Sequence, residues 1–386
     1  MARTMKLILS LDRFLILLIA VVVGASLLPV RGVAAAWTDL AADLAITLLF
    51  FLHGAKLSRA AIVQGIGNWR LHGWVLGSTF LLFPALGLAC VALLHGWSNP
   101  LLLSGLVFLT LLPSTVQSSI AFTAIARGNV AAAVCSASLS NLLGIFVTPL
   151  LVAVFMQGDG SGGGSGTVSS WHSIWSIVEQ LLIPFLAGHF LRPLIGGFVD
   201  RNKKILQPVD RGSILLVVYS AFSAAVVHGI WHQVGVRDLA MLLVLSAMIL
   251  AVVMLANWAV ARVTKMPRED FIVLLFCGSK KSLASGVPMA GAMFAPAHVG
   301  LIVLPLMIFH QLQLFVCAAL AGRFRREAEL AEATAARVAT LPRTESEIVA
   351  TAAMRDLTIP EACMPGVAAN LALLDRHAAT LAGTGQ

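Results

Sequence analysis

Long apolar segments recur along most of the chain and constrain its fold more than any other feature of the sequence. Ten of them approach or exceed the roughly 20 residues that a helix needs to cross a bilayer. By residue number they are 14–30, 37–54, 71–94, 101–126, 130–156, 171–191, 214–231, 239–260, 271–294 and 300–320. Only 11% of the 386 residues are charged, whereas a soluble domain carries about a quarter. The sequence therefore predicts an all-α polytopic membrane protein.

Lysines and arginines are distributed unevenly among the loops between these segments. With the N-terminus in the cytoplasm, eighteen fall on the cytoplasmic side and only Arg31 and Arg237 on the outer side. Because cytoplasmic loops are enriched in these residues, we expect a plasma or inner membrane protein with ten spans and both termini cytoplasmic. The net charge of +8 then reflects topology, and no nucleic acid partner is predicted. Cleavage of the first segment as a signal peptide is the alternative, and it would leave the sides of the other loops unchanged.

A Gly/Ser-rich stretch at 157–170 divides the ten segments into five and five. An odd number of spans in each half inverts the second half, as in many secondary transporters. We therefore predict an inverted repeat made of 1–156 and 171–322, followed by a polar cytoplasmic tail at 323–386. Within the tail, 325–340 is predicted to form a short surface helix and the remainder to be loosely ordered.

Polar runs interrupt the fourth segment of each half. The first run is LLPSTVQSSIAF at 111–122, and the second is FCGSKKSLASGVPMA at 276–290. Pro113 removes a backbone donor from one helix, and Gly278 and Gly286 loosen the other. Backbone groups freed within lipid need partners, so the two interruptions are expected to cross and to line a transport site near the bilayer midplane.

Two adjacent lysines lie inside the second interruption. Lys280 is nine residues from Phe271, which is roughly 14 Å into a core of about 30 Å. An ammonium at that depth needs an anion, water or free carbonyls. A structural ion pair with Glu179, the acidic residue deepest in a span, is one interpretation. A direct role in transport is the other.

The candidate substrate- or ion-binding residues are polar or charged and lie in or beside the interruptions: Ser114, Thr115, Gln117, Ser118, Ser119, Ser136, Ser140, Asn141, Lys280, Lys281 and Ser282. For Ser136, Ser140 and Asn141, helix packing is an equal alternative. Glu179 and His310 are candidate charge partners or proton carriers, although a buried histidine with satisfied hydrogen bonds is the favoured interpretation of His310. No nucleophile, phosphate-loop or metal-ligand motif is visible, so we predict neither an enzyme nor a resident cofactor or metal.

These features together resemble the bile acid:sodium symporter superfamily. The resemblance covers about 12–322 and includes the run ARGNVAAAVCSASLSNLLGIFVTPLL at 126–151. FLHGAKLS at 51–58 and CGSKKSLASGVPM at 277–289 are more similar to its SBF-like branch, which includes the vertebrate seventh member of solute-carrier family ten.

The resemblance implies a panel domain and a core domain that contains crossed helices four and nine. It also implies transport of an organic anion, bile-acid-like or another carboxylate or sulfonate, by alternating access with sodium. The family's sodium ligands lie on spans four, five and nine, which match Ser118, Ser119, Ser136, Ser140 and the stretch 276–282. Sodium-binding members have a glutamate in the ninth-span crossing, and this chain has none there.

The missing carboxylate leads to a hypothesis about the lysines. An ammonium could occupy the place of sodium and cross-link the freed carbonyls, favoured by the negative end of the first half-helix of span nine. Transport would then be independent of sodium, or coupled to protons through Lys280, Lys281 or Glu179. Two further alternatives are a non-transporting membrane regulator or sensor, and efflux of arsenite-like oxyanions through Cys135 and Cys277. Besides its substrate and membrane lipid the sequence indicates no partner, and it does not indicate an oligomeric state.

Overall fold

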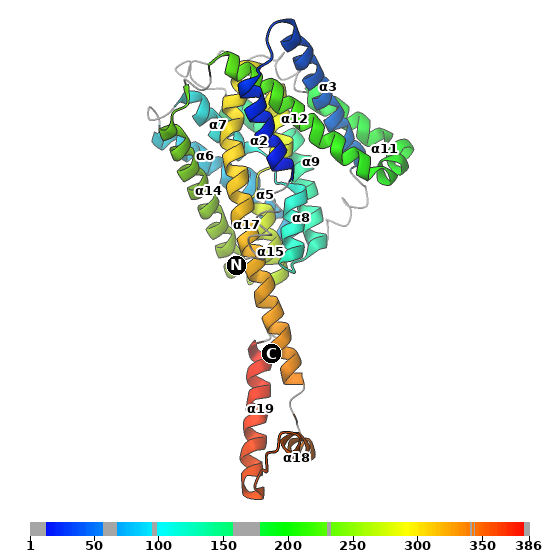
Figure 1. The fold of residues 1–386 in the computed structure, drawn as a ribbon, viewed down its shortest axis with the longest axis vertical. Helices are drawn as coiled ribbons and strands as arrows, with labels where there is room; N and C mark the ends of the chain where they lie inside the picture. The colour runs from blue at the N-terminus through cyan, green and yellow to red at the C-terminus, as the bar shows by residue number, and fades with distance from the viewer. Residues whose placement is uncertain are drawn as a thin grey trace. The chain divides into compact units, whose positions relative to one another are not determined.

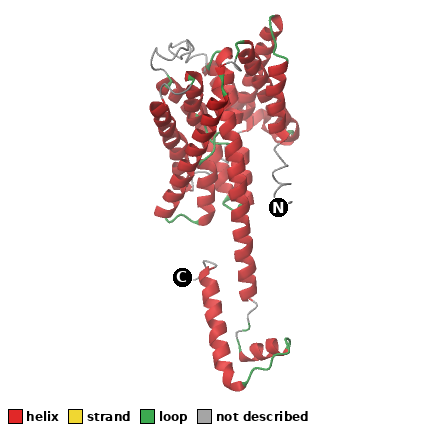
Figure 2. Ribbon diagram, turned by 60° about the vertical axis from the view of Figure 1, so that its left-hand side comes forward, coloured by secondary structure: helices red, strands yellow, loops and turns green. Residues whose placement is uncertain are grey.

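The computed structural model describes residues 13–56, 68–94, 99–156, 178–229, 233–339, 342 and 344–381. Within these ranges the chain forms helices and no strand, as Figure 2 shows. The predicted all-α class is confirmed. The Gly/Ser connector predicted at 157–170 lies outside the described residues.

Among the described residues, eight helical stretches are long and apolar enough to cross a membrane, and the bent pair α7–α8 makes a ninth. A shorter apolar helix, α2, precedes them. In chain order (Figure 1) the elements of this apolar part are α2 Arg13–Leu27, α3 Val33–Lys56, α5 Trp69–Gly77, η2 Ser78–Leu82, α6 Phe83–Leu94, α7 Pro100–Leu111, α8 Val116–Ile125, α9 Val130–Phe155, η3 Val178–Leu182, α11 Ile183–Arg201, α12 Lys203–Val227, α14 Val236–Val263, α15 Arg268–Gly278, α16 Leu283–Met293 and α17 Pro296–Ala339. Most of them fall on the apolar segments predicted from the sequence. The sixth and seventh differ: α11 continues to Arg201 and α12 already begins at Lys203, outside the predicted bounds 171–191 and 214–231.

Aliphatic side chains also cover the outer faces of these helices. Leu194 of α11 is 81% exposed, and Val263 at the end of α14 is 83% exposed. Apolar surface on this scale is unfavourable in water but suits the hydrocarbon of a bilayer. The chain is therefore a multi-pass membrane protein.

Helices α2, α3, α11 and α12 pack on one another. Helix α3 contacts α11 and α12, and α12 also contacts α2 (Figure 1). The crossing of α3 and α11 depends on two glycines: a Cβ added at Gly54 would lie 2.0 Å from the Phe185 carbonyl oxygen, and one at Gly188 would lie 2.0 Å from that of Phe51. Only glycine permits this approach.

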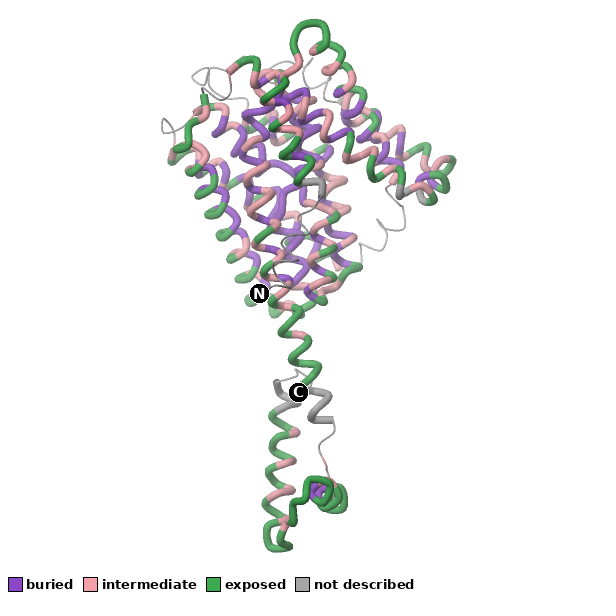
Figure 3. The backbone as a smooth tube through the Cα atoms, viewed as in Figure 1, coloured by how far each residue is buried: buried purple, intermediate pink, exposed green. Residues whose placement is uncertain are grey.

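The other apolar helices pack around α15, and α16 packs against helices of the first group. Helix α15 contacts α5, α9 and α14, and α16 contacts α12 and α3. Every residue from Ile272 to Gly278 is buried, and Figure 3 shows buried residues concentrated inside the helical bundle. Phe83 and Phe309 meet edge to face in this core, with ring centroids 5.8 Å apart. The broken helix α15–α16 thus lies where its polar groups must be satisfied by protein.

The chain divides into two compact units. Residues 1–124 and 128–318 form the first, and residues 125–127 and 319–386 form the second. The helix predicted at 325–340 is confirmed over 325–339, although it continues α17 rather than forming a separate helix. The prediction for the remainder of the tail is wrong. The tail beyond α17 contains α18 Glu345–Ala353, η4 Glu361–Cys363 and α19 Met364–Leu381, where a loosely ordered chain was expected.

Helix α18 begins with a capping box that the sequence already contains. The Thr344 Oγ1 accepts a hydrogen bond from the Glu347 N–H at 3.3 Å, and the Glu347 carboxylate accepts one from the Thr344 N–H at 3.2 Å. Such reciprocal pairs satisfy donors that a helix start leaves free. The Thr-x-x-Glu spacing was therefore an available signal for this helix.

Candidate functional site

The first interruption separates α7 from α8 at 112–115. Pro113 has no N–H, so the Leu109 carbonyl accepts a long bond of 3.4 Å from the N–H of Leu112 instead. The backbone at Leu112 is extended, with ψ of 156°. The two helices consequently meet at 60°, as the proline predicted.

The second interruption separates α15 from α16 at 279–282. Ser282 caps α16, because its Oγ accepts a hydrogen bond from the Ser285 N–H at 3.1 Å. Lys280 and Lys281 both lie in the non-helical stretch, and both side chains are fully buried.

The two interruptions contact each other directly, as predicted. Four hydrogen bonds join them, each from a donor in one interrupted helix to a backbone carbonyl in the other. The Ser282 N–H donates to the Pro113 carbonyl at 2.9 Å. In the opposite direction, three hydroxyls donate: Thr115 Oγ1 to Lys281 O at 2.9 Å, Ser114 Oγ to Cys277 O at 2.5 Å and Ser119 Oγ to Phe276 O at 3.2 Å. Backbone groups released by each break are thereby satisfied by the other break, which is what a non-aqueous interior requires.

The Lys281 ammonium binds three carbonyl oxygens at this junction. Its Nζ donates to Thr79 at 2.8 Å, to Thr110 at 2.8 Å and to Leu112 at 2.7 Å. It also lies 4.2 Å from the ring centroid of Phe83. All three donors of the ammonium are used. The negative end of α7, rather than that of α15, supplies two of the acceptors, so the expectation about span nine is wrong in that detail.

The Thr79 carbonyl is free because a π-helical turn meets a proline. In an α-helix this oxygen would accept from the N–H of Phe83, but that N–H donates to Ser78 across η2. The next residue is Pro84, which has no N–H. Lys281 therefore supplies a hydrogen bond that this helix cannot make for itself.

A hydrogen bond to helix α9 leaves the Thr110 carbonyl free to accept from Lys281. Ser140 Oγ accepts from the Ser114 N–H at 3.1 Å, and that N–H would have bonded Thr110 in an unbroken helix. Thr148 Oγ1 donates to the Leu111 carbonyl at 2.8 Å. Ser140 thus holds the first interruption open.

The Lys280 ammonium has a different environment. Its Nζ has one long hydrogen bond, 3.5 Å to Ser118 Oγ. It lies 4.1 Å from the ring centroid of Phe122 and 5.5 Å from that of Phe276. Each aromatic face attracts a cation by about 0.5–2 kcal/mol.

Gln313 of α17 clamps the backbone of Lys281. Its Oε1 accepts from the Lys281 N–H at 2.8 Å, and its Nε2 donates to the Lys281 carbonyl at 2.9 Å. The same Nε2 contacts His310 Nδ1 at 2.8 Å. His310 is therefore adjacent to the junction, one residue removed from the lysine.

Replacing Gln313 with leucine is expected to lower the free energy of unfolding, because it leaves the buried Lys281 N–H without a partner and the Lys281 carbonyl with the Thr115 hydroxyl as its remaining donor. A buried backbone group left without a partner costs about 1–3 kcal/mol. Thermal unfolding in detergent measures the effect, and Gln313→Glu should also be less stable than wild type, because its carboxyl group must be buried either charged or protonated. Equal stability of wild type and Gln313→Leu would contradict the role of the clamp.

The remaining α9 candidates make contacts between helices. Ser136 Oγ lies 2.7 Å from His72 Nδ1 of α5. Asn141 Oδ1 accepts from Ser285 Oγ at 2.8 Å. These bonds hold α9 against α5 and α16, which agrees with the packing interpretation without testing ion binding.

Two candidates lie away from the junction. Gln117 is exposed on α8. Glu179 is exposed on η3 and forms no ion pair with either lysine, although all three side chains are described. The predicted Lys–Glu pair is therefore absent, because Glu179 lies at the surface of its helix and the lysines lie in the core.

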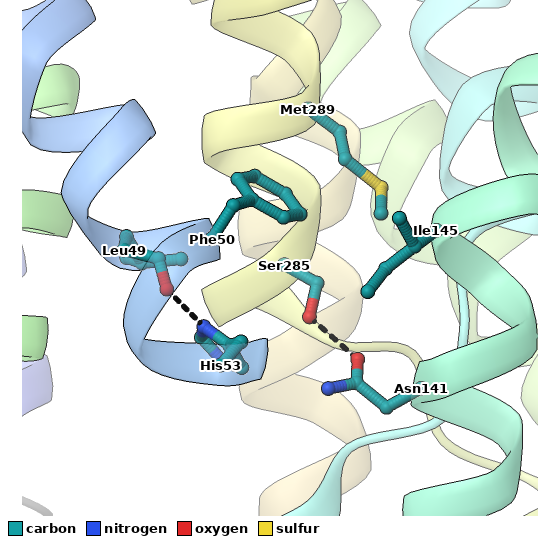
Figure 4. Close-up of a pocket in the computed structure, with 7 residues that line it drawn as sticks. All are labelled: Leu49, Phe50, His53, Asn141, Ile145, Ser285 and Met289. Carbon is teal, nitrogen blue, oxygen red and sulfur yellow. Dashed lines mark hydrogen bonds between the residues drawn. The ribbon is translucent and has the colours of Figure 1, made fainter. Parts of the chain in front are cut away.

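A pocket lies beside the junction, between α3, α9 and α16. Figure 4 shows Ser285 and Asn141 on one side of it and His53 on the other. Apolar side chains complete the lining: Leu49, Phe50, Ile145 and Met289. The His53 Nδ1 is 2.8 Å from the Leu49 carbonyl oxygen. The pocket thus combines an apolar wall with a few polar groups next to the first turn of α16.

The most important partners of Lys281 were not predicted. Thr79 and Thr110 act through backbone oxygens, which no side-chain pattern reveals. Pro84, five residues after Thr79, was an available signal for a free carbonyl. Gln313 was a second available signal, because an amide side chain inside an apolar segment needs hydrogen-bond partners.

A helical membrane protein in which two broken helices meet around buried charge belongs to the class of membrane transporters. The model of the SBF-like CPA transporter family matches residues 12–326, and the chain belongs to that family. The predicted resemblance is confirmed.

Relatives support the same class. The chain is 52% identical over 333 residues to "Putative symporter YfeH" of Escherichia coli K12, covering 85% of this chain and 97% of that protein. It is also 52% identical over 325 residues to the uncharacterized protein PA2026 of Pseudomonas aeruginosa, covering 84% and 96%. Sodium/bile acid cotransporter 7 of Danio rerio is 28% identical over 276 residues, covering 70% and 80%.

Proposed function

We propose that this protein is a secondary active transporter of a small organic anion, bile-acid-like or another carboxylate or sulfonate, that works by alternating access. The observation that carries the proposal is the junction of the two broken helices, which encloses two buried lysines and no buried carboxylate among the described residues. Positive charge beside a half-helix N-terminus suits an anionic substrate.

The topology we propose is ten spans in two inverted halves, with 157–170 as connector and 323–386 as a cytoplasmic tail. The helices that coincide with the predicted segments support it, as does the bias of eighteen basic residues against two. In this scheme α7–α8 and α15–α16 hold the fourth place in their halves. Both termini are cytoplasmic, in the cell membrane.

The substrate binds in the pocket between α3, α9 and α16. In the described structure this space is too small for an organic anion, so the substrate enters once the surrounding helices move apart. The apolar wall then contacts the body of an amphipathic anion, and Asn141, Ser285 and His53 offer hydrogen bonds. Helix α3 packs with α11 and α12, whereas α9 packs with the helices around α15. Movement of the first group against the second would open the pocket to either side.

Sodium is not required in this mechanism. The Lys281 ammonium already takes three carbonyl oxygens within 2.8 Å, and these are ligands of the kind that a hard cation needs. A sodium ion a few ångströms from a fixed ammonium would be repelled by several kcal/mol at low effective dielectric.

The test is a thermal-shift screen of the purified protein against amphipathic carboxylates and sulfonates, in sodium and in choline buffer. A ligand at a hundred times its Kd stabilises the folded protein by about 2.7 kcal/mol. We expect equal stabilisation in both buffers, followed by uptake into proteoliposomes without a sodium gradient. Uptake that requires sodium would overturn sodium independence, and the absence of any bound or transported anion would overturn the proposed function.

A further inference from the structure

The two adjacent lysines are bonded very differently. Lys281 donates to three carbonyl oxygens at 2.7–2.8 Å, and its backbone is clamped on both sides by Gln313. Lys280 has a single long hydrogen bond to Ser118. Since an ammonium carries three donors, Lys281 is saturated and Lys280 is not.

Loss of a proton would therefore have different consequences at the two sites. At Lys281 it would disrupt a set of three charge-assisted hydrogen bonds and leave carbonyls of two helices unpaired. At Lys280 it would forfeit one bond of 3.5 Å and contacts with the faces of Phe122 and Phe276. These losses are smaller than the loss of three charge-assisted hydrogen bonds at Lys281.

The ionisable groups around Lys280 include no carboxylate that would hold it in the protonated form, among the described residues. The thiols of Cys277 on α15 and Cys317 on α17 face it, and Lys281 is its neighbour in the chain. Helix α8 contributes the Ser118 hydroxyl and the Phe122 ring. Among the described residues, no carboxylate pairs with the Lys280 ammonium.

Lys280 itself is fully buried, so exchange of its proton requires an opening. Its one hydrogen-bond partner, Ser118, is only half-buried on α8, and the preceding residue, Gln117, is exposed. An opening beside α8 would bring water to the Lys280 amine without breaking the three hydrogen bonds of Lys281.

We propose that Lys280 is the proton-exchanging group of the transporter and that Lys281 is a permanent tether; this rests on the proposed transport function. In the exchange, the Nζ–H bond of Lys280 breaks, the electron pair stays on nitrogen and the proton passes to a water molecule. The reverse step occurs on the other side of the membrane. The coupled ion is then a proton.

Reductive methylation tests this in the folded, full-length protein without any substrate. The probe is isotope-labelled formaldehyde with dimethylamine–borane, both uncharged. The unprotonated amine adds to formaldehyde with loss of water, and the borane reduces the resulting imine, which leaves one or two labelled methyl groups on Nζ. Mass spectrometric fragmentation assigns the label to Lys280 or Lys281, and exposed Lys265 serves as the internal reference. The labelling is measured as a function of pH.

Lys280 is expected to react faster than Lys281 by on the order of tenfold or more, because each hydrogen bond to a charged group shifts the equilibrium by about that factor. Its rate should rise with pH. Equal rates at the two lysines, or full labelling of Lys265 with none at Lys280, would overturn the inference. Organic-anion uptake that persists in that case would leave the transport proposal standing.

Discussion

Replacing Lys281 with methionine is expected to cause the largest loss of stability of any single change at the junction. The substitution leaves the carbonyls of Thr79, Thr110 and Leu112 without their common donor. Each buried carbonyl left without a donor costs about 1–3 kcal/mol, and the surrounding lipid supplies no water to replace the ammonium. Thermal unfolding of the purified variant in detergent measures the loss.

Lys280→Met is the matched control, because it removes an equally buried ammonium one residue away. It forfeits one long hydrogen bond and two ring contacts, so its unfolding temperature should stay much closer to that of wild type. Equal destabilisation by the two variants would show that the three carbonyls do not depend on Lys281.

Replacing Gly188 with alanine is expected to have the second largest effect. The added Cβ would lie 2.0 Å from the Phe51 carbonyl oxygen, a backbone atom of α3 that cannot turn away. Helices α3 and α11 would have to separate along their crossing. Overpacking typically costs about 1–3 kcal/mol, and more where backbone must move. Thermal unfolding and the fraction of monodisperse protein after extraction measure it.

Gly197 provides the control on the same helix. An alanine Cβ there meets nothing within 4 Å, and alanine is favoured over glycine in a helix by about 1 kcal/mol. Gly197→Ala should therefore be neutral or stabilising. If Gly188→Ala were equally well tolerated, the close crossing of α3 and α11 would be contradicted.

The sequence predicted which segments are apolar and where two of them break. Pro113 interrupts α7–α8 because a proline has no N–H, and this depends only on local covalent structure. The contact between the two breaks was also predictable, since freed backbone groups in a bilayer have few alternatives.

The partners of each lysine were not predictable in the same way. Glu179 was a reasonable partner by depth along the chain, but its side chain faces outward from η3, and depth does not fix rotation about a helix axis. The acceptors that Lys281 uses are main-chain oxygens of Thr79, Thr110 and Leu112. Every residue carries such an oxygen, so composition cannot single them out.

The sequence by itself determined an all-helical, multi-pass membrane protein with two polar interruptions and a pair of lysines in one of them, because hydrophobic run length and proline chemistry act locally. Only the tertiary structure decided that the lysines differ. Lys281 reaches carbonyls more than 160 residues away in the chain, and Lys280 meets Phe122 of another helix. Contacts of that kind are set by how helices rotate and cross, which depends on the packing of the whole bundle.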